Sequence, residues 1–283
     1  MIRSNYHVHS TFCDGKNTVA EMAEAALAAG IGSLGFTSHA PLPYDNDWTM
    51  KPENIVAYLE AVKAAKTAYQ GQMDVFTGME IDYFIETGDI SPQMKAVRQK
   101  LDFCVGSIHV MGALPGGGHA DIDYTPEIFE QGLREIYGGS ARKFVETYYR
   151  CLGEMALQMK PDIVGHIDLI KKNNAGSRFF DEAADWYRRA ALACLEAIRD
   201  SGCIVEVNTG GMARYGARCL YPSDWLLEKI RDMGIPIVLN GDSHSAAAID
   251  YAYTEVLGKL SAMGFKSLML LDGKGWSPQA LEG

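Results

Sequence analysis

Residues 6–15 read Tyr6-His7-Val8-His9-Ser10-Thr11-Phe12-Cys13-Asp14-Gly15, and the rest of the chain is interpreted outward from this stretch. Side chains alternate between the two faces of a strand, so His7 and His9 point to the same side while Val8 points away. Neutral imidazole is a common metal ligand, and two imidazoles on one face begin a coordination sphere. Asp14 adds a carboxylate, and Gly15 allows a sharp turn after it. A His-x-His pair alone is also compatible with chance or with a structural role, so the remaining sequence has to decide.

The composition is that of an acidic globular protein. Of the 283 residues, 47% are hydrophobic and 22% are charged, and the formal net charge is −10. This apolar content supports a large core, and a single α/β barrel often reaches this length, so we expect one domain over residues 1–283. The acidic balance argues against a nucleic-acid-binding surface. We therefore expect a small-molecule substrate and no nucleic-acid partner, and a homodimer stays open.

The six cysteines form no Cys-x-x-Cys pair and have no regular spacing. The first residues do not have the pattern of a secretory leader, and no apolar run reaches membrane length. We expect reduced thiols, a cytoplasmic location and no membrane partner.

Strand and helix patterns alternate along the chain. Strands are predicted at 2–9, 33–37, 73–83, 103–108, 163–167, 203–208 and 235–240, followed by an apolar run at 267–271. Helical patterns cover 19–29, 53–69, 91–99, 126–137, 140–159, 181–201, 223–233 and 247–263, and Thr18 with Glu21 has the spacing of a capping box. Residues 111–125, rich in glycine and polar residues, are predicted to be a long loop without elements of its own, of the kind used as a lid or binding loop.

This alternation predicts a mostly parallel sheet in an α/β fold. Closed into a barrel, the sheet would bring the C-terminal ends of all its strands to one mouth, where the active sites of such barrels lie. Six of the seven histidines stand at or just after a predicted strand end: His7, His9, His39, His109, His166 and His244. Glu80 and Asp242 have the same position on the third and seventh strands, whereas His119 is expected to be a solvated loop residue.

Any one of these histidines has an ordinary reading as a core or loop residue, but six at one end of a sheet do not fit independent placement. Histidine and carboxylate ligands without thiolates suit Zn²⁺, Mn²⁺ or Fe²⁺. There are more candidate ligands than one ion needs, which implies a cluster in which Glu80 could bridge two ions. Asp82 and Asp168 are placed to orient the imidazoles from behind, although each could equally be an ordinary acid of a loop or of the edge of the core.

As an ordered set, the motifs resemble those of the PHP (polymerase and histidinol phosphatase) family, and most of all its monofunctional histidinol-phosphatases. The matching segments are Tyr6-His7-Val8-His9-Ser10 with Asp14-Gly15, Phe36-Thr37-Ser38-His39, Gly78-Met79-Glu80, Val105-Gly106-Ser107-Ile108-His109, Gly165-His166-Ile167-Asp168 and Gly241-Asp242-Ser243-His244. The resemblance implies a distorted TIM-like (β/α)7 barrel with the active site at the C-terminal ends of the strands. It also implies three divalent metal ions (Zn, Mn or Fe).

Carried over to this chain, the resemblance assigns the first ion to His7, His9, Glu80 and Asp242. Glu80 would bridge to a second ion completed by His109 and His166, and Asp14, His39 and His244 would hold the third. Some family members carry histidine where Asp14 stands, so the third site of this chain offers a harder ligand.

The implied activity is hydrolysis of L-histidinol phosphate, a step of histidine biosynthesis, by metal-activated hydroxide attacking phosphorus. Glu80, Asp242 and His244 would be its catalytic residues. A phosphomonoester also needs cationic partners, for which Arg214 is the first candidate and Lys171 or Lys172 the second, although each could equally be a solvated surface cation. Similar phosphatases commonly carry arginine where the two lysines stand, which puts the second contact in doubt.

Recognition of the rest of the substrate is less defined. The aromatic and acidic residues of 42–48 and the 111–125 loop could bind an amino-alcohol with an imidazole. Glu206 and Asn208 share the inward face of a strand, where they could bind the substrate amine or fill the barrel with hydrogen-bonded polar groups.

Three rival functions share parts of this pattern. Another PHP-type phosphoesterase acting on nucleotides or oligonucleotides would use the same metal ligands, but would need basic and aromatic residues around the mouth. An amidohydrolase barrel also begins with His-x-His, yet usually carries a bridging lysine where this chain has Glu80. A metal-stabilised interaction module would bind metal without turnover.

Overall fold

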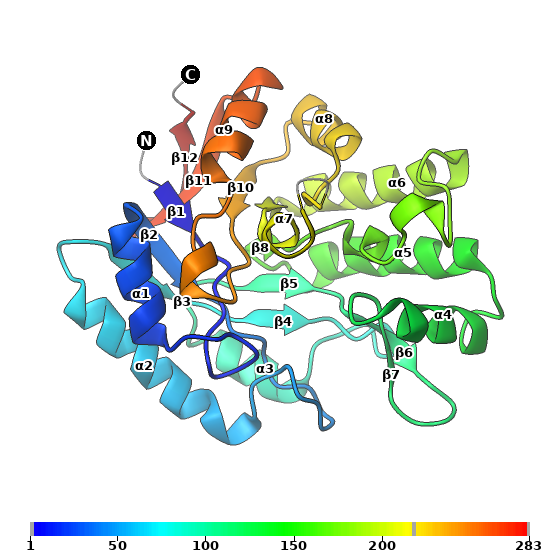
Figure 1. Cartoon of the computed structure of the whole chain (residues 1–283), viewed down its shortest axis with the longest axis horizontal. Helices are drawn as coiled ribbons and strands as arrows, with labels where there is room; N and C mark the ends of the chain where they lie inside the picture. Colours follow the sequence, from blue (N-terminus) through cyan, green and yellow to red (C-terminus); the bar gives the residue numbers. More distant parts are fainter. Residues whose placement is uncertain (1–2, 217–218, 282–283) are drawn as a thin grey trace.

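The computed structural model describes residues 3–216 and 219–281 (Figure 1). Its central parallel sheet has two pieces. The first pairs β1 (Arg3–Asn5), β2 (Ile31–Phe36) and β3 (Asp74–Thr77) in that order. The second follows the order β10 (Ile237–Asn240), β9 (Ile204–Asn208), β8 (Ile163–Val164), β5 (Val105–Ser107) and β4 (Glu80–Asp82). The predicted parallel α/β architecture is therefore confirmed.

The two pieces join at a bend between β3 and β4. The predicted third strand is interrupted at Gly78 and Met79. Gly78 N donates to Phe36 O at 2.8 Å. The ring of Phe103 packs so closely here that the Cβ of any other residue at position 78 would lie only 2.7 Å from it. An isolated parallel bridge pairs His39 with Glu80 just beyond the bend. The bend turns Glu80 toward the strand ends of the other piece.

The opposite edge, between β10 and β1, makes the barrel a distorted one. Side-chain amides take the place of the backbone ladder there: Asn240 Oδ1 accepts from Tyr6 N at 2.8 Å, and Asn5 Oδ1 accepts from His7 N at 3.1 Å and Gly241 N at 3.0 Å. Val8 and Ser243 then form an isolated parallel bridge. In the described part of the chain, the ring of strands is thus not closed by a continuous ladder, and the TIM-like barrel predicted from the sequence holds in this open form.

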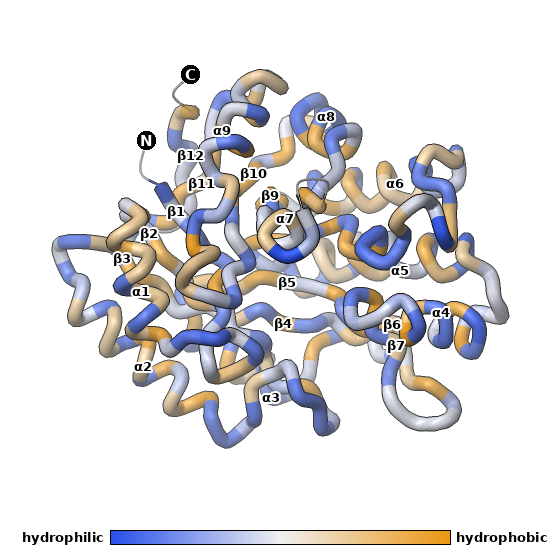
Figure 2. Tube along the Cα trace, in the orientation of Figure 1, coloured by the Kyte–Doolittle hydropathy of each residue, from blue (hydrophilic) through white to orange (hydrophobic). Residues whose placement is uncertain are grey.

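The helices lie mostly on the outside of the strands (Figure 1). They are α1 (Val19–Ala28), α2 (Ile55–Ala68), α3 (Pro92–Arg98), α4 (Pro126–Glu135), α5 (Ala141–Gln158), α6 (Asp185–Ser201), α7 (Gly210–Tyr215), α8 (Asp224–Asp232) and α9 (Tyr253–Ala262), with short 3₁₀ turns η1 (Pro52–Asn54), η2 (Leu169–Lys171), η3 (Ala175–Ser177) and η4 (Ala246–Ala248). The predicted capping box at the start of α1 is confirmed, because Glu21 N donates to Thr18 Oγ1 and Thr18 N donates to Glu21 Oε2. Hydrophilic and hydrophobic residues alternate along α2 (Figure 2), whose Ile55, Tyr58 and Val62 are buried.

Two parts of the chain differ from the prediction. Residues 111–125 are not a loop throughout, because β6 (Val110–Ala113) and β7 (His119–Asp121) form an antiparallel hairpin whose turn uses Gly117 and Gly118 at positive φ. The short helix α7 was not predicted, since it begins with two glycines. The apolar run at 267–271 becomes β11 (Ser267–Asp272), which pairs with β12 (Gly275–Ala280).

The hairpin β11–β12 packs against the N-terminal ends of the barrel strands. Leu271 N donates to the hydroxyl of Tyr6 at 2.9 Å, and the Trp276 ring lies edge-on to Tyr6 at 5.0 Å between centroids. A second hydrophobic cluster forms around Tyr6, Phe103 and Leu271. The end of the barrel opposite the strand C-termini is therefore filled with apolar side chains.

All six cysteines are free thiols, as expected. Among the residues that the structure describes, no helix has both the length and the apolar character needed to cross a bilayer.

Candidate metal centre

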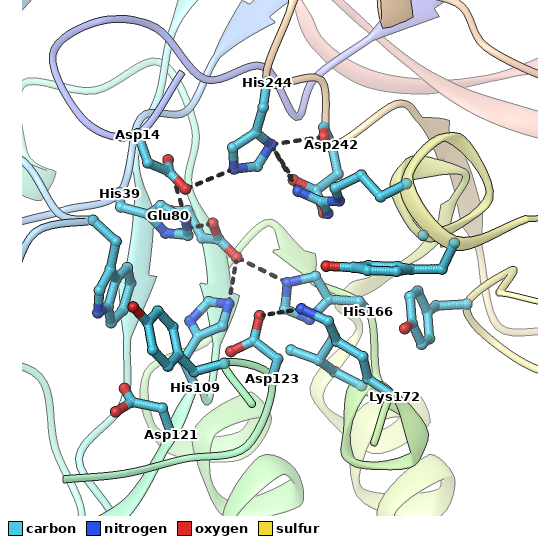
Figure 3. A pocket seen from close by; sticks show the side chains of 17 residues that line it. Asp14, His39, Glu80, His109, Asp121, Asp123, His166, Lys172, Asp242 and His244 are labelled. Carbon is cyan, nitrogen blue, oxygen red and sulfur yellow. Dashed lines mark hydrogen bonds and ion pairs between the residues drawn. The ribbon is translucent and has the colours of Figure 1, made fainter. Parts of the chain in front are cut away.

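All nine residues predicted as metal ligands come together at the C-terminal side of the central sheet. Figure 3 labels the seven of them that line the cavity. Most follow a strand directly, Glu80 is the first residue of β4, and Asp14 lies in the loop between β1 and α1. The nine are His7, His9, Asp14, His39, Glu80, His109, His166, Asp242 and His244. Because they belong to six different parallel strands and their following loops, only the fold could bring them to one place.

Four overlapping groups within the cluster could each hold an ion, with ligand atoms within 4.8 Å of one another. The groups are His9 with Asp14, His39 and His244; His7 with Glu80 and His166; His7 with His9 and Asp242; and His39 with Glu80 and His109. His7, His9, His39 and Glu80 each belong to two groups. The geometry is that of one continuous cluster, with Glu80 near its middle, rather than of separate sites.

Several buried atoms at the centre of the cluster make no hydrogen bond: His7 Nε2, His9 Nε2, His39 Nδ1 and Glu80 Oε2. Glu80 Oε2 nevertheless lies 3.1 Å from His7 Nε2 and 2.9 Å from His39 Nδ1. Buried polar groups without partners are rare in folded proteins because each carries its desolvation cost. Lone pairs of nitrogen and oxygen that converge without hydrogen bonds fit divalent cations, and the lack of thiolates among these ligands suits Zn²⁺, Mn²⁺ or Fe²⁺.

The electrostatics of the cluster favour ionised carboxylates. Burial by itself would raise the pKa of Glu80, but the imidazoles of His7 and His39 hold that pKa well below its usual range. Burial likewise opposes ionisation of Asp242, and the guanidinium of Arg214 overcomes it, so the pKa of Asp242 is also well below its ordinary value. The same carboxylate field attracts any cation placed between these side chains.

Behind the cluster, Glu206 occupies the middle of the barrel. Its Oε1 accepts from His7 Nδ1 at 2.6 Å and from Asn240 Nδ2 at 2.9 Å, while its Oε2 accepts from His166 N and Asn208 Nδ2, both at 2.9 Å. Of the two roles left open by the sequence for Glu206 and Asn208, the structure favours the barrel-filling one, since both side chains are fully buried and hydrogen-bonded. Glu206 also leaves Nε2 of His7 free to face the cluster.

The two other acids expected behind the imidazoles behave differently. Asp82 accepts from His109 N at 2.9 Å and lies 3.0 Å from His109 Nδ1, so it orients that ring as predicted. Asp168 instead accepts from Lys171 Nζ at 2.6 Å and from Ser223 N at 2.8 Å, so it ties two loops together and orients no imidazole.

Of the three cationic side chains considered as phosphate contacts, Arg214 and Lys172 line the cavity and Lys171 does not. Arg214 lines the cavity and donates from Nη2 to Asp242 Oδ2 at 2.8 Å. The prediction for Lys171 needs correction, because its ammonium is taken by Asp168 and by Leu220 O at 3.0 Å, over the ring of Tyr221. Lys172 lines the cavity in its place and donates to Asp123 Oδ2 at 3.2 Å.

The cavity in front of the cluster has a volume of about 310 Å³. Besides the ligands and the two cations, the residues that line the cavity include Trp48, Tyr124, Asp121 and Asp123, of which the last three were predicted only as part of the 111–125 loop. Burial raises the pKa of Asp121 to about 7, with the carboxylate of Asp123 adding to the effect. Had the hairpin been predicted, the alternation of side chains along residues 119–123 would have placed Asp121 and Asp123 on one face, toward the cavity.

His119 is not the solvated loop residue expected from the sequence. Its ring is stacked face to face on Tyr44, with 3.5 Å between centroids and 13° between planes, and it is partly buried. The stack links the 42–48 segment to the β6–β7 hairpin.

Comparison with known proteins gives consistent results. The PHP domain model matches residues 5–210. A histidinol-phosphatase of Bacillus subtilis is 30% identical over 272 residues, covering 91% of this chain and 99% of the relative. A solved structure from Listeria monocytogenes, provisionally identified as a histidinol phosphatase, has a TM-score of 0.76 at 20% identity and covers 89% of this chain and 99% of that one. Histidinol phosphate phosphatase from Lactococcus lactis, solved with zinc, L-histidinol and phosphate, has a TM-score of 0.69 at 17% identity and covers 97% and 98% of the two chains.

Proposed function

The chain belongs to the PHP domain family, and we propose that it is a metal-dependent phosphomonoesterase that hydrolyses L-histidinol phosphate to L-histidinol and phosphate. The observation that carries this proposal is the convergence of nine histidine and carboxylate side chains, four of whose buried atoms lack hydrogen bonds, on a cavity that also holds Arg214 and Lys172. The substrate is supported by the Bacillus subtilis relative, which this chain matches over almost the whole length of both.

The chain would hold three divalent ions, shared among the four overlapping groups of the cluster. When bound, such ions supply positive charge for the phosphoryl oxygens and lower the pKa of water that they hold. Glu80 belongs to two of the groups, which suits a bridging carboxylate. Asp242 and His244 lie beside Arg214, so these two metal ligands would adjoin the guanidinium that binds the phosphoryl group.

The protein's own residues position the substrate around this centre. Arg214 presents a planar guanidinium that can bind two phosphoryl oxygens, and its contact with Asp242 keeps it at the edge of the cluster. Lys172, whose ammonium lies over the ring of Tyr215, adds a second charge to the cavity. Glu206 and Asp82 keep the rings of His7 and His109 in fixed orientations, which preserves the geometry that in-line displacement needs.

The walls of the cavity argue against an oligonucleotide substrate. Asp121 and Asp123 would face a polyanionic backbone, and the chain has a net charge of −10. We propose that the whole chain is one PHP-type domain. Sedimentation will show whether it forms a homodimer, which the sequence leaves open.

The test compares phosphate release from L-histidinol phosphate, 4-nitrophenyl phosphate and a short oligonucleotide, each with Zn²⁺ or Mn²⁺. We expect the largest kcat/KM for L-histidinol phosphate. Faster cleavage of the oligonucleotide would retain the metal centre and refute the substrate, whereas no cleavage of any of the three would refute the enzyme itself.

A further inference from the structure

One carboxylate of the cavity, that of Asp121, has no cationic partner. Arg214 is paired with Asp242 at 2.8 Å and Lys172 with Asp123 at 3.2 Å. Within residues 3–216 and 219–281, no lysine, arginine or histidine side chain forms an ion pair with Asp121. Metal ions would neutralise Glu80, Asp242 and Asp14, but Asp121 lies beyond His109, across the cavity from Asp242 (Figure 3).

The β6–β7 hairpin fixes the position of this carboxylate. Asp121 is the last residue of β7 and is the register partner of Val110, and Ile122 N donates to His109 O at 2.9 Å. Asp121 is therefore tied through the backbone to the strand end that carries a candidate metal ligand. A residue on such a paired element is held more precisely than one on a free loop.

A second unmet polar group lies next to the same face of the hairpin, although it does not line the cavity. Successive residues of β7 alternate faces, so His119 and Asp121 lie on one side while Ala120 is buried on the other. Tyr44 stacks on His119, and its buried hydroxyl has no hydrogen-bond partner. Burial raises the pKa of Tyr44, and the nearby carboxylates of Asp82 and Asp121 add to that effect. The Tyr44–His119 stack thus supports the hairpin next to Asp121, and of these side chains only Asp121 lines the cavity.

We propose that Asp121 determines substrate specificity by binding a cationic nitrogen at the end of the substrate remote from phosphorus, beside the aromatic side chains of Trp48 and Tyr124 that also line the cavity. This inference rests on the proposed function and adds to it: the preferred substrates are phosphomonoesters that also carry an amine or an imidazole. A partly desolvated carboxylate gains a charge-assisted hydrogen bond from such a nitrogen, whereas an ester without one leaves it unpaired. A site built to pair a polar group discriminates strongly against analogues that lack it.

The experiment measures kcat and KM of the parent protein and of Asp121→Asn, both loaded with Zn²⁺, on four esters. They are L-histidinol phosphate, 3-(imidazol-4-yl)propyl phosphate without the amine, phenylalaninol phosphate without the imidazole, and 4-nitrophenyl phosphate without either. Glu127→Gln, the same chemical change at an exposed position in α4, serves as the matched control.

Asp121→Asn is expected to raise KM for L-histidinol phosphate by about 10-fold or more, from the loss of one charge-assisted contact, with little change in kcat. KM for 4-nitrophenyl phosphate and the zinc content should stay as in the parent protein. The analogue that keeps the large effect identifies the nitrogen: phenylalaninol phosphate indicates the amine, and the imidazolyl ester indicates the ring.

Equal changes on all four esters, or none on L-histidinol phosphate, would overturn the inference, since the first indicates a structural role and the second no contact. These outcomes concern the variant. Failure of the proposed function is seen separately in the parent protein, as failure to prefer L-histidinol phosphate over 4-nitrophenyl phosphate, and it would remove the basis of the inference too.

Discussion

Replacing Glu206 by glutamine should weaken metal binding without removing any metal ligand. The carboxylate accepts four hydrogen bonds, two on each oxygen, from His7, Asn240, His166 and Asn208. A carboxamide has one oxygen and one NH₂ group, so one pair of donors must face another donor.

The surroundings allow little rearrangement. Asn240 Oδ1 already accepts from Tyr6 N, and Asn208 Oδ1 accepts from Gly210 N, both at 2.8 Å, so neither amide can flip without losing a bond. His7 can adapt by moving its proton from Nδ1 to Nε2, which would point an N–H bond into the cluster. His7 stays in place, but in this tautomer its Nε2 presents a proton instead of a lone pair to the ion, which weakens metal binding.

The magnitudes follow from these contacts. Each buried donor left without an acceptor costs about 1–3 kcal/mol, so two such donors would cost about 2–6 kcal/mol of unfolding free energy. Loss of a residue that orients a metal-bound histidine typically lowers metal affinity by about 10- to 100-fold.

The assay measures zinc affinity by competition with a chromophoric chelator, and stability by urea unfolding of metal-free protein. Glu182→Gln is the matched control, because Glu182 is a partly buried acid that accepts from Asn174 and belongs neither to the cavity lining nor to the ligand cluster. Zinc affinity in Glu206→Gln equal to that of the control would refute the role assigned to Glu206.

Three further predictions concern other parts of the molecule. Glu80→Ala should release metal and abolish phosphate release, measured by elemental analysis and turnover; parent-like values would exclude a central role for this carboxylate. Arg214→Ala should mainly raise KM, with a loss of about 1.5–3 kcal/mol in transition-state binding for one charge-assisted contact, and an unchanged KM would remove Arg214 from the site. Thr18→Ala should lower the unfolding free energy by about 1 kcal/mol through loss of the α1 cap, with no effect on metal content. Hydrogen bonds from Thr18 lower the pKa of Glu21 below its ordinary 4.5. The stabilisation by Glu21 is therefore present above pH 4.5 and is lost as the pH falls through the lowered pKa. Urea unfolding should show a smaller difference in unfolding free energy between the parent protein and Thr18→Ala at pH 3 than at pH 7.

Much of the site could be predicted because its signals are local. Histidines and acids at strand ends can be found from strand periodicity alone, and parallel strands with helical crossovers place those ends together. Eight of the nine candidate ligands therefore needed no knowledge of packing, and the ninth, Asp14 in a loop, came from the resemblance to the PHP family. The division of the ligands into groups could not be predicted without the packing. His39 belongs to two groups because the bend between β3 and β4 places Glu80 beside it.

The closure of the barrel lay outside the reach of sequence patterns. Asn5 and Asn240 are more than 200 residues apart, and nothing local shows that their amides replace a backbone ladder. The β6–β7 hairpin was missed because a glycine-rich turn between two short strands has the composition of a loop. The choice between Lys171 and Lys172 depended on the 3₁₀ turn η2, in which residues three apart are eclipsed, so that Lys171 meets Asp168 and Lys172 turns to the cavity.

The central claim is that this cluster hydrolyses L-histidinol phosphate only when it holds metal. Its most direct test is phosphate release from L-histidinol phosphate by protein stripped with a chelator, dialysed, and then titrated with Zn²⁺ or Mn²⁺. The account predicts no turnover after stripping and a return of activity that saturates as the cluster fills, with three ions per chain at saturation. Undiminished turnover by protein shown to be metal-free would contradict it.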